Sequence, residues 1–192
     1  MKKLLLVLLA FLMLQLNAEE KYVFDIVVTG KSIGKATATI NTLPDGSTEY
    51  LFKSDAKTKA FFKERTSHSD IRLLYRNNEL QNGKYVREKD GEWQRVGIKK
   101  ENGVYKIDDD GEKIEEKKPI KFTTTQFFFE EPVGIKEVWV ERFSQFVPIE
   151  KVDAHTYKTN VDGSNNFYTY KDGKLVEYMI KNIVNIYMRL ME

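Results

Sequence analysis

The sequence predicts a single all-β domain of about ten antiparallel strands, folded into a strongly curved sheet or partly open barrel around a short aromatic plug. Three observations support this fold class. Apolar and polar residues alternate with period two in many short segments. Asp-Gly and Asn-Gly pairs recur at intervals of roughly eight to twelve residues, the spacing of antiparallel hairpins. No stretch after residue 18 has the apolar spacing of an ordinary amphipathic helix.

The first eighteen residues have the pattern of a secretory signal peptide. Lys2 and Lys3 precede an apolar run over residues 4–14, and Ala18 offers a small residue for cleavage. The run is short for an uncleaved membrane anchor. We therefore expect residues 1–18 to be removed and residues 19–192 to form one domain. The chain contains no cysteine, which leaves no lipoprotein acylation site and no disulfide, and the expected location is the periplasm.

The charge balance argues against a nucleic-acid partner. The whole chain has 31 basic and 29 acidic residues, but two of the lysines lie in the predicted leader, which has no acid. Residues 19–192 therefore carry 29 charges of each sign. Nucleic-acid binding requires a clear basic excess on one face.

Residues 21–76 read as a series of strands. From residue 21, Tyr22, Phe24 and Ile26 share one face, and the alternation resumes over residues 35–40 after a turn at residues 30–32. Residues 44–46 form a Pro-Asp-Gly turn. Residues 50–52 begin a third strand, and residues 67–76 alternate again.

The middle of the chain predicts meandering hairpins. Turn pairs at residues 90–91, 102–103 and 110–111 separate short apolar strand centres. Charged residues flank these centres on both sides over residues 84–118, so we expect one well-solvated face. The charge run over residues 108–118 is interpreted as a solvated hairpin tip.

Residues 122–132, with the sequence FTTTQFFFEEP, fit neither a half-buried strand nor a tight turn. Three consecutive phenylalanines, Phe127, Phe128 and Phe129, cannot all face one side of a strand. We expect a short helical or irregular plug that holds two groups of strands together, with at least two of the three rings buried.

Extended structure resumes after the plug. The pattern predicts strands over residues 138–140, 147–149, 155–160, 166–171 and 174–181. The last strand is predicted over residues 184–191, with Val184, Ile186, Met188 and Leu190 on one face. Long apolar strands at both ends of the domain indicate that both lie in the central sheet.

Together these features resemble the exported bacterial family named domain of unknown function 6134. The shared motifs are Gly-x-x-Ile-Gly at residues 30–34, Phe-Phe-Phe-Glu-Glu-Pro at 127–132, Glu-Arg-Phe and Phe-Val-Pro-Ile at 141–149, and Tyr-Lys followed by Asp-Gly-Ser-Asn-Asn-Phe-Tyr at 157–168. The resemblance covers essentially the whole domain. It implies an exported, mostly antiparallel β-protein, and it brings no catalytic residue.

The sequence lacks the residue patterns of common active sites, so we expect no enzyme, no cofactor and no metal. His68 and His155 are the only histidines and lie in no ligand spacing. Residues 67–70, Ser-His-Ser-Asp, contain triad residue types, but neighbours on a strand point to opposite faces. No Gly-x-Ser-x-Gly elbow and no phosphate-binding glycine loop occurs.

Glu130 and Glu131 are the acids that directly follow the aromatic cluster. Burial against phenylalanine would raise the pKa of a carboxylate and suit it to general acid chemistry. The alternative is a structural ion pair that braces the plug, with Arg142 as the expected partner. We favour the structural role.

The predicted function is binding of an apolar ligand, such as a lipid or acyl chain, by a non-enzymatic exported protein. The candidate ligand-binding residues are Phe127, Phe128, Phe129, Trp139, Phe143 and Phe146. One alternative is an envelope module that binds another protein through a sheet edge or exposed aromatics. A carboxylate-dependent hydrolase using Glu130 or Glu131 is a third hypothesis. Charged residues in most middle strands argue against an integral outer-membrane barrel.

Overall fold

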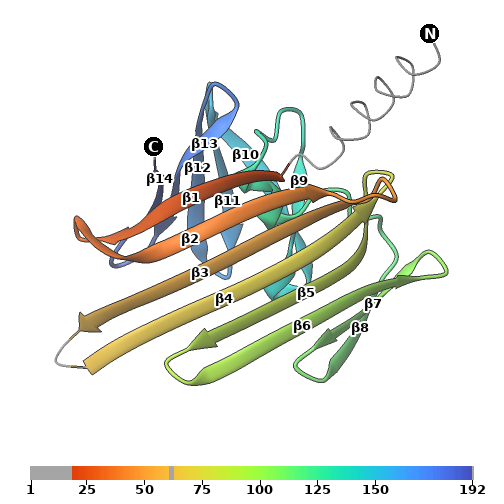
Figure 1. Cartoon of the computed structure of the whole chain (residues 1–192), viewed down its shortest axis with the longest axis horizontal. Helices are drawn as coiled ribbons and strands as arrows, with labels where there is room; N and C mark the ends of the chain where they lie inside the picture. Colours follow the sequence, from red (N-terminus) through yellow and green to blue (C-terminus); the bar gives the residue numbers. More distant parts are fainter. Residues whose placement is uncertain (1–18, 61–62, 192) are drawn as a thin grey trace, which may run out of the picture.

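The computed structural model describes residues 19–60 and 63–191 and confirms the all-β fold class (Figure 1). The predicted signal peptide lies outside these residues. The first arm of the sheet contains β1 (Glu19–Val28), β2 (Lys31–Thr42), β3 (Thr48–Ala60), β4 (Lys63–Arg76), β5 (Glu79–Lys89), β6 (Glu92–Glu101), β7 (Val104–Asp109) and β8 (Glu112–Glu116). The second arm contains β9 (Glu137–Val140), β10 (Gln145–Asp153), β11 (Thr156–Val161), β12 (Ser164–Lys171), β13 (Lys174–Lys181) and β14 (Ile186–Leu190).

The two arms join where the first and last strands pair. The strand order is β8-β7-β6-β5-β4-β3-β2-β1-β14-β13-β12-β11-β10-β9, and every strand pair is antiparallel. Phe24 of β1 lies opposite Leu190 of β14. Each arm is therefore a meander of hairpins, and the strands nearest the chain ends form the centre of the sheet, as the two apolar terminal strands predict.

The turn residues follow the predicted chemistry. Asp90, Asn102 and Asp110 have positive φ, and each precedes a glycine that also has positive φ. This pair of conformations is the one that a tight two-residue hairpin needs. The hairpins between β5 and β8 are thus confirmed where the sequence predicts them.

The predicted number of about ten strands is wrong, because the described residues form fourteen. One strand that the sequence does not predict is β8, because its charged residues are interpreted as part of a hairpin tip. The sequence also understates the length of β3, where the small residues Ser54 and Ala56 occupy inward positions and hide the apolar alternation. The last strand also begins at Ile186 and not at Val184, which lies in the preceding turn and is 48% exposed.

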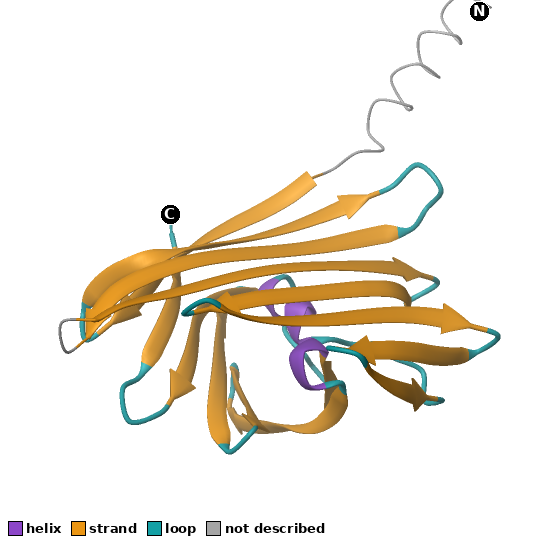
Figure 2. Ribbon diagram, turned by 90° about the horizontal axis from the view of Figure 1, so that it is seen from below, coloured by secondary structure: helices purple, strands orange, loops and turns teal. Residues whose placement is uncertain are grey.

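The sheet curls around two short 3₁₀ helices, η1 (Thr124–Phe128) and η2 (Glu141–Phe143), drawn in purple in Figure 2. Phe127 stacks on Tyr168 of β12 with 4.0 Å between ring centroids. Phe128 contacts Phe52 of β3 at 4.6 Å and Phe24 of β1 at 5.3 Å. The plug therefore binds one arm of the sheet to the other, as predicted, with Phe127 and Phe128 buried.

The sheet is not closed, and its two outer edges differ. At β9, the backbone N–H of Trp139 donates to the carbonyl of Phe122 at 2.9 Å, so the chain that leads into the plug covers this edge. At the other end of the strand order, β8 is five residues long with the sequence EKIEE. A short charged edge strand resists pairing with another chain.

Candidate functional site

The six aromatic residues predicted to bind a ligand do not lie together in the structure. Phe127, Phe128 and Trp139 are buried, whereas Phe129, Phe143 and Phe146 are partly exposed. Phe129 packs near the rings of Tyr22 and Tyr50, at 6.1 and 5.5 Å between centroids.

Phe143 and Phe146 each lie beside a cation. The Arg142 guanidinium lies 4.6 Å from the Phe143 ring centre. The Lys118 ammonium lies 4.3 Å from that of Phe146. The partly exposed rings thus have different surroundings, and the six residues do not line one common site.

Glu130 and Glu131 lie in different environments. Loss of surrounding water raises the pKa of the Glu130 carboxyl, although the residue is exposed overall, and a hydrogen bond from Gln126 opposes this shift. Glu131 accepts a hydrogen bond from the Tyr157 hydroxyl at 2.8 Å and lies 3.1 Å from Nδ1 of His155.

The prediction that Arg142 forms an ion pair with one of these two acids is wrong. Arg142 donates from Nε to Oε1 of Gln94 at 3.2 Å and accepts from Nε2 of Gln94 at its backbone carbonyl at 2.9 Å. Glu131 braces the plug against the start of β11 through His155 and Tyr157 instead.

A buried carboxylate that the sequence did not single out lies at the start of the plug. Glu141 is 1% exposed. It accepts hydrogen bonds from the Thr124 hydroxyl and from the backbone N–H and hydroxyl of Thr125, the last two at 3.0 and 2.6 Å. These partners satisfy the carboxylate and leave it a structural role.

The concave face is not fully covered by the plug. One line of directly opposed residues crosses six strands, from β13 through β14, β1, β2 and β3 to β4. We call this line the inner row; its residues are Tyr178, Met188, Ile26, Gly34, Ala56 and Ser67. Ile26 is buried, and the other five are partly exposed. The inner row is therefore an accessible strip of apolar and small residues on the concave face.

Two arginines lie next to this strip. Arg87 lies two residues from buried Tyr85 on β5, so both side chains face the interior. Its directly opposed neighbours are Ser69 on β4 and Gln94 on β6. Gln94 in turn binds Arg142. Burial lowers the pKa of Arg87, and the charge of Arg142 lowers it further.

The two arginines also act electrostatically on tyrosines of both arms. Burial raises the pKa of Tyr85 to about 12, while Arg142 and Arg87 act in the opposite direction. Burial also raises the pKa of Tyr178, again opposed by Arg142. Arg142 is thus close enough to act electrostatically on β5 and on β13. The sequence contains one indication of this pair of arginines: Arg87, a charged residue, occupies an inward position two residues after Tyr85.

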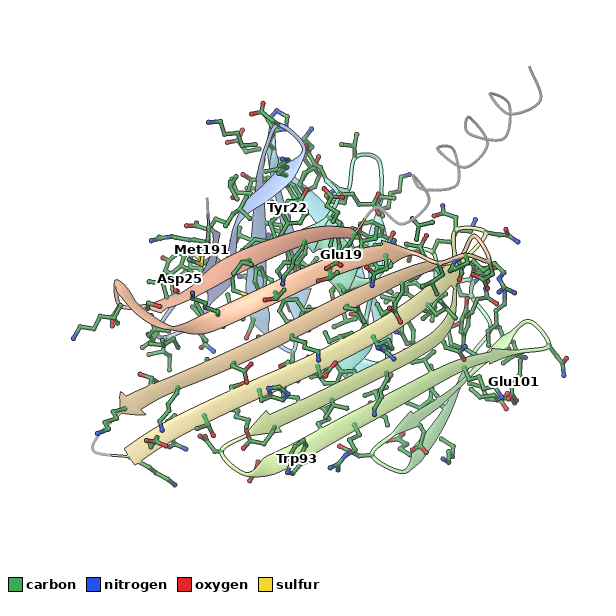
Figure 3. All side chains as sticks on the ribbon, in the orientation of Figure 1. Glu19, Tyr22, Asp25, Trp93, Glu101 and Met191 are labelled. Carbon is green, nitrogen blue, oxygen red and sulfur yellow. The ribbon has the colours of Figure 1, made fainter. Side chains whose placement is uncertain are left out.

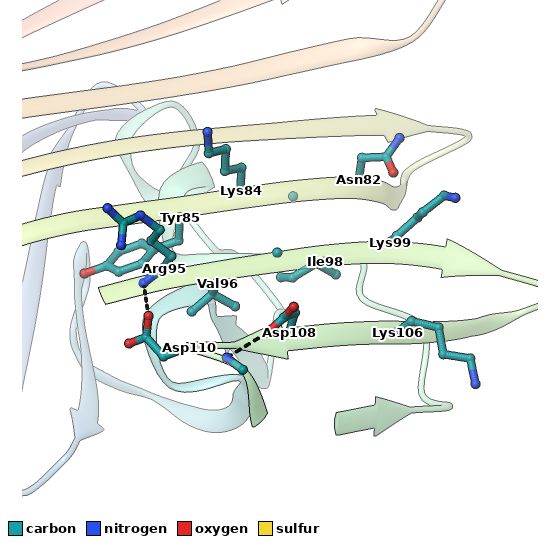
Figure 4. Close-up of a pocket in the computed structure, with 13 residues that line it drawn as sticks. Asn82, Lys84, Tyr85, Arg95, Val96, Ile98, Lys99, Lys106, Asp108 and Asp110 are labelled. Atoms are coloured by element: carbon teal, nitrogen blue, oxygen red, sulfur yellow. Dashed lines mark hydrogen bonds between the residues drawn. The ribbon is translucent and has the colours of Figure 1, made fainter. Parts of the chain in front are cut away.

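Two open hollows lie on the convex outer face. Trp93, which is labelled in Figure 3, is 53% exposed on this face of β6. The Arg95 guanidinium lies 4.9 Å from the centre of its ring. The first hollow lies over Gly97, which has Lys84 and Asp108 as its cross-strand neighbours (Figure 4). Asp108 and Asp110 accept backbone hydrogen bonds at 2.8 Å there, from Gly111 and Arg95.

The second hollow contains His68. Nδ1 of His68 lies 2.7 Å from a carboxylate oxygen of Asp55, and Glu88 follows on the next strand. Within the described ranges, no group of three or more potential metal-ligating residues comes together. None of the helices in those ranges has the length and hydropathy of a membrane span.

Comparison with known proteins adds the family and the fold. No curated protein matches the chain. Among solved structures, the chain is similar to the crystal structure of a β-barrel-like protein of domain of unknown function DUF1849 from Brucella abortus, with a TM-score of 0.58 and 11% sequence identity. The alignment covers 92% of this chain and 97% of the other. At this identity the likeness concerns the fold alone.

The family match spans both arms and the plug. The model of the family described as domain of unknown function (DUF6134) matches residues 24–190, from within β1 to the end of β14. This range contains the plug, the inner row and the two arginines. The chain belongs to the DUF6134 family, as the resemblance of its motifs predicts.

Proposed function

We propose that this protein is an exported, non-enzymatic carrier that holds an apolar ligand, such as a lipid or acyl chain, against the concave face of its sheet. The observation that carries the proposal is the inner row. Five of its six residues stay partly exposed although they face the interior of the fold. Concave apolar surfaces with a few polar groups are the usual setting of small-molecule sites.

The proposal shifts the expected binding surface away from the plug. Phe127, Phe128 and Trp139 are already packed against protein, and a ligand would have to displace those contacts. Tyr178, Met188 and Ala56 pack against the core as well, but part of the surface of each stays exposed and open to a ligand. The aromatic plug then forms the floor that positions the two arms, and the ligand lies beside it.

Binding of another protein through the sheet edge finds less support. The β9 edge is covered by the chain around Phe122, and β8 is short and charged. A hydrolase based on Glu130 or Glu131 also finds less support. Glu131 is engaged by Tyr157 and His155, and Glu130 has only Gln126 as a hydrogen-bond partner among the described residues.

The test uses the purified domain, residues 19–192. Native mass spectrometry and organic extraction are expected to reveal a bound lipid, and a fluorescent fatty acid is expected to bind to the stripped protein. Ala56→Phe fills the inner row and is expected to reduce binding of the probe. Lys57→Phe, at the next position but on the exposed outer face, is the matched control and should bind as the wild type does. A protein that carries no lipid and ignores the probe would refute the proposal.

A further inference from the structure

We infer that the ligand of the inner row is an anionic amphiphile whose carboxylate or phosphate head group binds between Arg87 and Arg142. This inference rests on the proposed function, which it makes more specific. It depends on three features: the position of the two arginines, the absence of acids paired with them, and the apolar strip beside them.

The position follows from the sheet register and from one side chain. Arg87 of β5 faces Gln94 of β6, and directly opposed side chains of an antiparallel pair are neighbours, with Cβ atoms about 5 Å apart. Gln94 Oε1 accepts from Nε of Arg142 at 3.2 Å. Gln94 thus lies beside Arg87 and holds the Arg142 guanidinium on the same interior face.

Within residues 19–60 and 63–191, neither arginine forms a salt bridge. The acids near them have other partners. Asp90, close to Arg87 in sequence, accepts from Arg65 and from the backbone of Thr66, at 2.9 and 3.0 Å. Glu141, adjacent to Arg142, is bound by the threonines of the plug.

Two partly buried cations that form no salt bridge are costly to hold together, and the charge of Asp90 offsets this cost only in part for Arg87. Their mutual repulsion contributes to the lowered pKa of Arg87. An anion between them removes this cost, and the guanidinium fork matches the oxygens of a carboxylate or phosphate. Only Nε of Arg142 is used by Gln94 among the described hydrogen bonds, so its terminal N–H groups remain for a ligand.

The apolar strip gives the ligand its second property. Arg87 lies opposite Ser69, and Ser67, two residues away on the same strand, is the last member of the inner row. From there the row runs through Ala56 to Met188 and Tyr178, and Tyr178 lies within the electrostatic reach of Arg142. Charge and apolar surface thus meet on one interior face, which fits an acyl chain with an acidic head group.

The test compares four probes on the stripped domain by isothermal titration calorimetry: oleate, lysophosphatidate, neutral monooleoylglycerol and inorganic phosphate. Oleate or lysophosphatidate is expected to bind at least about tenfold more tightly than monooleoylglycerol, since a charge-assisted hydrogen bond is worth at least about 1.4 kcal/mol. The preferred head group distinguishes carboxylate from phosphate. Inorganic phosphate is expected to bind weakly, because it lacks the chain.

Arg87→Gln and Arg142→Gln are each expected to remove the preference for the anionic probes, so that oleate and lysophosphatidate bind no more tightly than monooleoylglycerol. Arg95→Gln, on the exposed outer face of β6, is the control. If all three amphiphiles bind equally, or if Arg87→Gln has no effect, the head-group inference is wrong while the carrier function stands. If inorganic phosphate binds as tightly as lysophosphatidate, the acyl chain contributes nothing to binding and the ligand is not an amphiphile. If no amphiphile binds, both proposals fail together.

Discussion

Glu141 accepts a hydrogen bond from the backbone N–H of Thr125 at 3.0 Å, which ties the end of β9 to the first turn of the plug. The plug in turn carries the two phenylalanines that join the arms. A single buried carboxylate therefore connects the second arm to the element that the first arm packs on.

Glu141→Gln is expected to lower the free energy of unfolding by about 2 kcal/mol or more, since each hydrogen bond to a buried charged group is worth about 1.5–3 kcal/mol. The amide keeps the shape but supplies one acceptor oxygen in place of two, and its NH₂ group meets donors. Urea denaturation measures the change. Glu150→Gln, which removes a surface ion pair to Lys158, is the control, with an expected loss below about 1 kcal/mol. Equal midpoints for the two variants would contradict this role for Glu141.

Phe127→Ala is expected to cost about 3–5 kcal/mol, because the side chain is fully buried and its stack on Tyr168 is lost. Phe129→Ala should cost clearly less, since its ring is partly exposed. Thermal or urea unfolding compares the two, with Trp93→Ala as an exposed aromatic control. A Phe129 variant that is the less stable of the two would show that the plug is held by its exposed end.

Gly34→Ala is expected to destabilise the domain, and Gly97→Ala is not. A Cβ atom at Gly34 would lie 1.9 Å from the carbonyl oxygen of Asp55, so β2 and β3 would have to separate locally. Nothing lies within 4 Å of the corresponding position at Gly97, and alanine is the better strand residue. Overpacking of this kind costs about 1–3 kcal/mol. Unfolding midpoints that fall equally in both variants would refute the steric explanation.

Glu130→Gln is expected to stabilise the protein at neutral pH. The pKa of this acid is raised in the folded state above its ordinary value of 4.5, so ionisation favours the unfolded chain. Its unfavourable contribution is absent below pH 4.5 and develops as the pH rises through the folded-state pKa. Melting temperatures of wild type and variant should therefore coincide near pH 4 and diverge towards pH 7.

Glu131→Gln is the matched control for this experiment. It loses the charged acceptor of Tyr157 and His155, so it should melt below the wild type at pH 7. A Glu130→Gln variant that melts below the wild type at neutral pH would contradict the prediction. Activity screens of the same two variants test the hydrolase hypothesis, for which we expect no turnover.

The sequence was informative wherever a residue type has one structural meaning. Asp-Gly and Asn-Gly pairs located the hairpins, and three consecutive phenylalanines located the plug. The strand prediction failed at β8, whose charged sequence gives little apolar alternation. It also understated the length of β3, where inward positions carry Ser54 and Ala56. Ala56 is a member of the inner row, so a small residue that hides the strand in the sequence also keeps the row accessible.

The arginine pair could not be predicted from the chain alone. Arg87 and Arg142 are 55 positions apart in the sequence, and they meet through Gln94 only because β6 and η2 lie together in the fold. The prediction that Arg142 pairs with an acid of the plug is wrong because the fold places Arg142 beside Gln94. Glu131 is close to Arg142 in the sequence, but its carboxylate lies against His155 and Tyr157.

The pairing of β1 with β14 has a consequence for the order of folding. Both arms consist of local hairpins, which form quickly, whereas this seam requires residues near the two ends of the chain to meet, which is slow. We expect the arms to gain structure first and the seam last. Pulse-labelled hydrogen exchange during refolding would then protect the amides of the β5–β6 hairpin before those of β14, and the reverse order would exclude this sequence of events. A nascent chain that lacks its final strand has no partner for the outer edge of β1. The domain therefore stays incomplete until its last residues are available.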